Sequence, residues 1–182
     1  MMSKIPEFSE EILRLNLHNL KDAIDNSKKV RYENPKSPEL WIESDILIEK
    51  YVRKISILSA YPEMIRTFVT VEGVQLLSEV IKHANTTLTL SALTFLLELT
   101  EIEIVENEKS LSHLVFLVDE ILSNRIIEDI IQNMNRYDET REDEKEGIFK
   151  VLGVLENVLE IKPEATQQIG KGTYLFNWIV KK

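Results

Sequence analysis

The side chains best suited to chemistry in this sequence are three carboxylates and an amide that recur at a fixed distance. Glu98 and Glu101 correspond to Asn157 and Glu160, which follow 59 positions later. Carboxylates accept charge-assisted hydrogen bonds from Lys and Arg, and an amide can clamp the backbone of an extended peptide. We therefore predict that these four residues bind a peptide. The alternative is that they cap and solvate the ends of helices.

A second candidate surface is the acidic run at residues 138–146. It holds six acidic residues against Arg141 and Lys145. Such a segment attracts basic partners. A solvated insertion, or the charged start of a helix, is the alternative interpretation, and both stay open.

Catalytic and metal-binding patterns are missing from the sequence. The chain has no cysteine, and His18, His83 and His113 lack the spacing of metal ligands. Residues 170–173 (GKGT) lack the glycine that a phosphate loop carries ahead of its lysine. We therefore expect no enzymatic activity, no cofactor and no metal.

The net charge of −9 is unevenly distributed along the 182 residues. Residues 1–40 carry seven basic and seven acidic residues, whereas residues 41–182 carry 15 basic and 24 acidic ones. An acidic surface repels phosphate backbones, which disfavours direct nucleic-acid binding and favours basic partners. No apolar stretch of about 18 residues is present, so we expect no membrane partner.

The elements that position these side chains follow a helical period of apolar residues. In residues 1–61 the period predicts one helix capped by Ser9 and a second capped by Ser44. The proline-containing segment 34–38 separates them, because proline denies backbone donors to a helix. We interpret residues 1–61 as an N-terminal helical cap.

An internal repeat follows the cap. The apolar pairs of residues 76–81 recur at 126–131, an offset of 50, and the apolar helix predicted over 88–100 recurs at an offset of 59. The difference between these offsets places an insertion at the acidic run. Pro62-Glu63 is also repeated, as Pro163-Glu164.

This order of helices predicts an all-α fold, an α-solenoid of armadillo or HEAT type. Residues 62–182 would hold about two repeats and the start of a third, and the cap could continue them as one solenoid. A plain helical bundle with accidental self-similarity is the alternative.

Four segments resemble the β-catenin-like protein 1 family, in order and with compatible spacing. They are residues 34–45 (NPKSPELWIESD), 94–101 (TFLLELTE), 131–140 (IQNMNRYDET) and 155–165 (LENVLEIKPEA). The resemblance runs from about residue 30 to the last residue. It implies a nuclear armadillo-type protein associated with the spliceosome. Because family members are much longer, it also implies that this chain is a fragment.

The resemblance further implies a scaffold for pre-mRNA splicing. Such a scaffold binds basic, nuclear-localisation-type segments of splicing factors, notably the cell-division-cycle-5-like protein, and it self-associates. Two other functions stay open. A nuclear-import-type carrier would need repeated Trp and Asn pairs, whereas this chain has only Trp41 and Trp178. A structural assembly module would use its apolar faces to complete a neighbour.

Overall fold

The computed structural model describes residues 8–102, 107–172 and 174–181. The described residues form ten α-helices, which are α1 (Glu10–Glu33), α2 (Ile42–Ser56), α3 (Ile65–Thr70), α4 (Gly73–Ile81), α5 (Thr86–Thr100), α6 (Glu108–Ser123), α7 (Ile126–Asn133), α8 (Glu142–Ile161), α9 (Thr166–Gly172) and α10 (Leu175–Lys181). Short 3₁₀ helices join several of them, namely η1 (Pro38–Leu40), η2 (Ile57–Ala60), η3 (Pro62–Met64), η5 (Met134–Arg136) and η6 (Pro163–Ala165).

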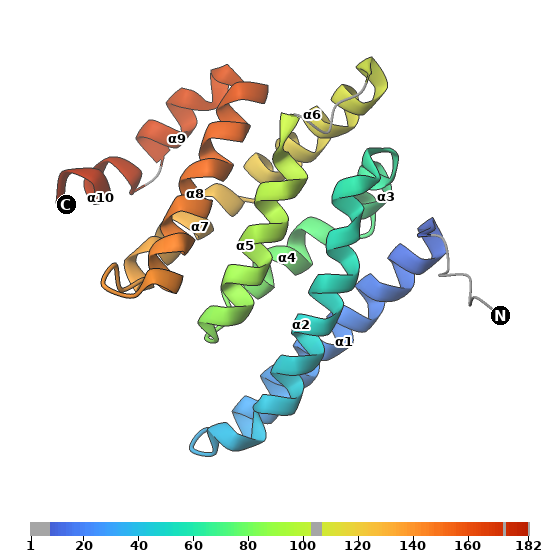
Figure 1. Ribbon diagram of the computed structural model, residues 1–182, viewed down its shortest axis with the longest axis vertical. Coiled ribbons are helices and arrows are strands. Elements are labelled where there is room, and N and C mark those ends of the chain that lie inside the picture. Colours follow the sequence, from blue (N-terminus) through green and yellow to red (C-terminus); the bar gives the residue numbers. More distant parts are fainter. Residues whose placement is uncertain (1–7, 103–106, 173, 182) are drawn as a thin grey trace.

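The long helices lie in two layers (Figure 1). Helices α2, α5 and α8 lie side by side and run in the same direction, and α5 packs against both of the others. Helices α1, α4 and α7 form the layer behind them, with α4 between its two neighbours. The shorter α3 and the helix α6 pack against each other and lead into α4 and α7.

The triplet α3–α5 is therefore followed by a second triplet, α6–α8, with the same order and the same direction of its last helix. Stacking of this kind is the defining feature of a solenoid, in which each repeat buries its apolar face on its neighbours. The prediction of an all-α solenoid is confirmed. The helices η6 and α9 repeat the start of the first triplet, as the recurrence of Pro-Glu predicted.

The two predicted helix caps have different outcomes. Ser9 caps α1 as predicted, because its side-chain oxygen accepts a hydrogen bond from the backbone N–H of Ile12. The prediction for Ser44 is wrong, since α2 already begins at Ile42. The Ser44 hydroxyl instead donates to the carbonyl of Trp41, at 2.7 Å, within the first turn of α2.

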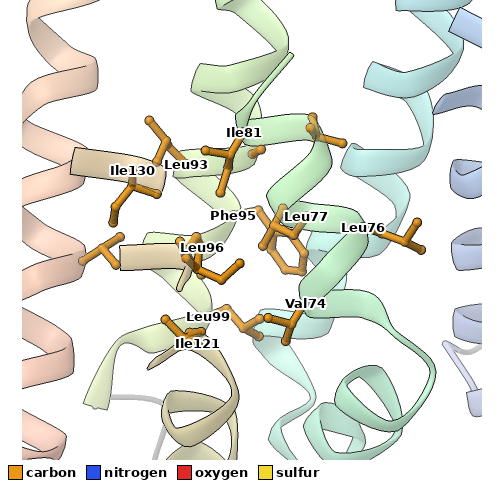
Figure 2. Packing of buried hydrophobic residues seen from close by; sticks show 14 of the residues in the cluster. Val74, Leu76, Leu77, Ile81, Leu93, Phe95, Leu96, Leu99, Ile121 and Ile130 are labelled. Atoms are coloured by element: carbon orange, nitrogen blue, oxygen red, sulfur yellow. The ribbon is translucent and has the colours of Figure 1, made fainter. Parts of the chain in front are cut away.

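One apolar cluster extends from Phe8 to Ile169 and takes side chains from both layers. Figure 2 shows its centre, where side chains of α4 and α5 meet those of α6 and α7. Phe68 of α3 and Phe95 of α5 pack edge to face, with ring centroids 5.9 Å apart. Phe8 contacts Tyr61 at 5.2 Å between centroids, so the first described residue reaches the junction with the first triplet. The division after residue 61 stays a prediction.

The two triplets share a backbone conformation at the residue before their second helix. Glu72 before α4 and Arg125 before α7 have left-handed backbones, with φ of 63° and 60°. These positions are 53 apart (125 − 72), not the 50 that the apolar pattern predicted. A shift of three residues is nearly one helical turn, so both alignments place apolar residues on the buried face.

Among the described residues, no helix combines the length and the apolar character that crossing a bilayer requires.

Candidate peptide-binding face

The candidate site lies on the outer side of α5 and α8, which approach each other closely at two glycines. A Cβ on Gly147 would lie 2.6 Å from a Leu90 methyl group, and a Cβ on Gly153 would lie 2.9 Å from a Leu97 methyl group. Both distances are shorter than ordinary carbon contacts. Glycine at these two points of α8 therefore lets the helix approach α5 along the face where the predicted residues lie.

Asn157 takes part in this helix contact. It is half-buried, and its side-chain N–H groups donate to the Leu97 carbonyl at 3.3 Å and to the Thr100 hydroxyl at 3.2 Å. The amide donors thus join α8 to the last turn of α5. This packing role is independent of any bound peptide, and the role of Asn157 in peptide binding stays a prediction.

The three predicted carboxylates gather at one end of the face. Glu98 and Glu101 are half-buried at the C-terminal end of α5, and Glu160 is exposed in the last turn of α8. Because α5 and α8 run in the same direction, these ends lie at the same edge of the layer (Figure 1). The structure thus places carboxylates from both triplets along one edge.

The helix dipoles strengthen the negative potential at this edge. The C-terminal end of a helix carries a partial negative charge. Carboxylates at that end add to the negative potential, and the potential attracts cations. Neither α5 nor α8 has a basic residue in its last turn. The cation next to these ends is Lys162 at the C-cap of α8, and its ammonium group pairs with Asp119 of α6.

Exposed apolar side chains lie on α8 two to three turns before the acidic edge. Phe149 is 61% exposed on α8, and Leu152 is also exposed one turn further on. Leu90 and Leu97 of α5 are half-buried and pack against the core. A ligand on this face would meet an apolar area followed by carboxylates.

The acidic run forms the entry to α8 rather than a separate loop. Residues 142–146 belong to the first turns of this helix. Glu144 is buried, and its carboxylate accepts a hydrogen bond from the Asp138 backbone N–H at 2.7 Å and pairs with Arg141 at 3.0 Å. Bonds from the Thr140 hydroxyl and backbone N–H hold the pKa of the Asp138 carboxyl below its ordinary value.

The side chain of Tyr137 packs against the N-terminal part of α8. Its ring lies against Gly147, 3.2 Å from where a Cβ would be. Burial raises the pKa of its hydroxyl to about 12. Part of the acidic run thus organises the turn before α8, while Glu139, Glu142 and Glu146 remain exposed.

The three histidines lie apart in the structure, as they do in the sequence. His18 is exposed beside Asp22 on α1, at 3.5 Å. His113 is buried on α6, and its Nδ1 lies 3.1 Å from the Pro62 carbonyl, which links α6 to η3. Within the described ranges, no group of three or more His, Asp or Glu side chains could hold a metal ion.

His83 belongs to a polar cluster that the sequence patterns did not predict. Arg31 donates two hydrogen bonds to the Asp45 carboxylate, at 2.6 and 2.7 Å, and Asn85 donates a third at 2.9 Å. The His83 ring lies 3.7 Å from the same carboxylate and 3.3 Å from the Ser27 hydroxyl. This cluster joins α1 and α2 to the turn between α4 and α5.

Trp41 completes the cluster from its other side. The Arg31 guanidinium lies 4.5 Å from the centre of the Trp41 ring, and the indole N–H donates to the Asn34 carbonyl at 3.0 Å. Trp41 and Asp45 both belong to the segment 34–45 on which the family resemblance rests. That resemblance was the only signal in the sequence that pointed to these residues.

Stacked helical triplets with parallel last helices and an acidic outer edge define the class of the protein, an α-solenoid of armadillo type. The comparison with family models makes the assignment more specific. The family described as "Catenin-beta-like, Arm-motif containing nuclear" matches residues 2–182, so the chain belongs to this nuclear family.

Individual relatives agree with this assignment. The chain is 29% identical over 167 residues to the "Beta-catenin-like protein 1 homolog" of Schizosaccharomyces pombe. The aligned region covers 90% of this chain and 28% of the relative. It is 25% identical over 156 residues to the human "Beta-catenin-like protein 1", covering 86% of this chain and 27% of the relative. The chain thus spans 27–28% of the length of these two relatives.

Proposed function

We propose that this chain is a non-enzymatic protein-interaction scaffold of the spliceosome, which binds basic nuclear-localisation-type segments of splicing factors on the outer side of α5 and α8. The observation that carries the proposal is the row of Glu98, Glu101 and Glu160 at the negative ends of two parallel helices. The splicing role, and the cell-division-cycle-5-like protein as the partner, rest on the family resemblance.

Charge and shape support a basic, extended ligand. Lys and Arg side chains would form charge-assisted hydrogen bonds with the carboxylates, while apolar parts of the same extended peptide cover Phe149 and Leu152 two to three turns earlier on α8. Exposed charge pairs contribute little individually and are screened by salt. We therefore expect weak binding that depends strongly on ionic strength.

The test uses a fluorescently labelled synthetic peptide of alternating Lys-Arg pairs and small residues. We expect a Kd of tens of micromolar at about 50 mM salt, and binding about tenfold weaker at about 300 mM. The triple variant Glu98→Gln, Glu101→Gln, Glu160→Gln should abolish most of this affinity. A matched control replaces three exposed acidic residues around the turn between α1 and α2, Glu33→Gln, Glu39→Gln and Glu43→Gln, and should bind as the wild type does.

Two results would contradict the proposal. One is the absence of binding at both salt concentrations, and the other is equal loss of affinity in the triple variant and its control. Asn157 is left unchanged in both variants. Replacing it would remove its hydrogen bonds to α5, so a loss of binding could not be separated from a loss of packing.

A structural assembly module is the second candidate, and α10 favours it. Phe176, Ile179 and Val180 are each more than half exposed on this helix. Light scattering of the chain over a range of concentrations tests the alternative. Oligomers that grow with concentration and dissociate on Phe176→Ser would favour assembly over peptide binding. A nuclear-import-type carrier has less support, because Trp41 packs on Arg31 and its indole N–H is already bonded.

A further inference from the structure

One line of exposed side chains along α8 is apolar at its start and acidic at its end. Phe149, Glu156 and Glu160 lie within about 40° of one another at 100° per residue. Leu152 lies about 60° to one side of Phe149. Phe149 is 61% exposed, Leu152 is 37% exposed, and both glutamates are exposed. Successive members are three or four residues apart, so the line is continuous on the helix surface.

The apolar part of this line continues onto α5. Leu90 and Leu97 are half-buried, and their methyl groups lie where a Cβ on Gly147 or Gly153 would be. Because glycine contributes no side chain, part of each leucine stays exposed between the two helices. Single exposed apolar residues are ordinary, whereas adjoining ones on two helices indicate a surface that a partner covers.

Glu156 is a carboxylate of this face that the repeat pattern did not identify. It lies one turn before Glu160 and is exposed. At the offset of 59 its counterpart in α5 is Leu97 (156 − 59), so the comparison of the two triplets gave no acidic pair at this position. Only its place on the exposed line of α8 relates it to the other carboxylates.

Negative charge is in excess at the acidic end. Four carboxylates there form no ion pair with any described residue, namely Glu98, Glu101, Glu156 and Glu160. The nearest cations along α8 already have partners, since Lys150 pairs with Glu146 and Lys162 pairs with Asp119. Basic groups of a ligand would complement this charge.

Helix geometry sets the spacing of a ligand that uses both parts of the line. Glu156 and Glu160 are 7 and 11 residues after Phe149, which is about 10 and about 16 Å along the helix axis. An extended peptide rises about 3.3 Å per residue, and its alternate side chains point to the same side. A residue four positions from an apolar one therefore lies about 13 Å away, between the two glutamates, and faces the same side. A residue three or five positions away faces the opposite side.

We propose that the ligand of this face is an extended peptide in which an apolar side chain and a Lys or Arg lie four positions apart. The apolar side chain covers Phe149 and Leu152, and the basic one lies between Glu156 and Glu160. This inference rests on the proposed function and narrows it from basic segments in general to those with this pattern. A run of basic residues alone would leave Phe149 uncovered.

The test compares labelled synthetic peptides on the full chain. The first peptide has Leu at one position and Arg and Lys four and six positions later, with Ser and Gly elsewhere. In the second peptide Ala replaces Leu. In the third, Leu is moved one position toward the basic residues, so that it faces the opposite side. Each peptide is also made with its sequence reversed, because an extended chain can lie on the face in either direction.

In one of the two directions, we expect the first peptide to bind about fivefold more tightly than the second and the third at about 50 mM salt. Phe149→Ser should remove this advantage and leave the affinity for the second peptide unchanged. Glu156→Gln should weaken the binding of the first and second peptides alike, by about threefold. The control variant is Leu15→Ser, which removes an exposed leucine of α1 and should leave all affinities unchanged. Thermal melting by circular dichroism confirms that each variant folds.

Equal, salt-sensitive binding of the first and second peptides would overturn this inference and leave the proposed function in place. No binding of any of these peptides would also overturn it, and the proposed function fails with it only if the peptide of Lys-Arg pairs does not bind either. An advantage of Leu that persists in Phe149→Ser would contradict the assignment of the apolar contact. A wild-type dimer in sedimentation that Phe149→Ser dissociates would assign the face to a second copy, and would overturn the inference too.

Discussion

The first and second helical triplets enter their middle helix through the same left-handed backbone position but place different residues after it. Gly73 starts α4, whereas Ile126 starts α7. A Cβ on Gly73 would lie 2.3 Å from the Phe68 ring and 2.6 Å from the Phe68 carbonyl oxygen. The second triplet accommodates a buried isoleucine at the equivalent point. Repetition of a backbone plan therefore does not imply repetition of the packing inside it.

The turns into the last helices show the same contrast. Asn85 and Asp138 each accept a hydrogen bond from the backbone N–H two residues later, at 2.9 Å. After this shared turn, α5 has one acidic residue, whereas α8 has six acidic and two basic residues. The backbone keeps the two helices parallel, and side-chain chemistry makes one nearly neutral and the other acidic.

The largest expected effect is that of Gly73→Ala. The new methyl group would collide with a buried ring and with a backbone oxygen, and neither can move without disturbing the core. We expect the free energy of unfolding to fall by about 3 kcal/mol, at the upper end of the usual range for overpacking. Urea denaturation followed by circular dichroism measures it.

Gly153→Ala in the second triplet is the matched control. Its Cβ would meet only a methyl group of the half-buried Leu97, which can rotate, and alanine favours the helix. We expect a loss below about 1 kcal/mol. Equal losses in the two variants would show that the crowding around Gly73 does not distinguish the triplets.

An intermediate effect is expected for Asn85→Ala. This residue accepts a bond from the Thr87 backbone N–H and donates to Asp45, so its loss affects both the cap of α5 and the polar cluster. We expect a cost of about 2 kcal/mol, at the top of the range for helix caps. Urea midpoints of this variant and of Asp138→Ala give the comparison. The loss should be smaller for Asp138, whose bonds remain within its own turn, and the reverse order would contradict this interpretation.

The smallest expected effect is the pH dependence contributed by His83. Burial lowers the pKa of its imidazole, while Asp45 opposes this effect and Arg31 and Arg136 add to it. As the pH falls below 6.5, the unfolded chain binds a proton at this residue before the folded chain does. The free energy of unfolding should therefore fall with pH until the folded-state pKa is passed.

The measurement compares urea midpoints of the wild type and of His83→Gln at about pH 7.5 and about pH 5.5. Glutamine keeps a polar group near Ser27 but does not titrate. We expect the variant to lose less stability than the wild type over this interval. A larger loss in the variant would mean that protonation of His83 strengthens the cluster by pairing with Asp45.

Much of the architecture could be predicted from local patterns. The helical period, the Ser9 cap and the repeated Pro-Glu starts depend on neighbours a few residues away, so the sequence contains their causes. The Ser44 cap failed because a serine near a helix start can bond within the first turn as well as before it. The offset of 50 failed because apolar period alone cannot distinguish alignments that differ by about one turn.

The candidate site was predictable only in part. The carboxylates Glu98, Glu101 and Glu160 lie along one edge, since parallel helices bring equivalent ends together. Asn157 could be recognised as equivalent to Glu98, but its bonds to Leu97 and Thr100 depend on how close α8 approaches α5. At that approach, glycines of α8 face Leu90 and Leu97, which are more than 50 residues away in the sequence.

The sequence by itself determined where most of the helices form. The apolar period, the capping side chains and the proline positions act within one or two helical turns. The contacts among Arg31, Asp45, His83 and Asn85 were decided only when helices distant in sequence packed together. The physical reason is that burial and hydrogen-bond partners between helices depend on distances that no local pattern contains.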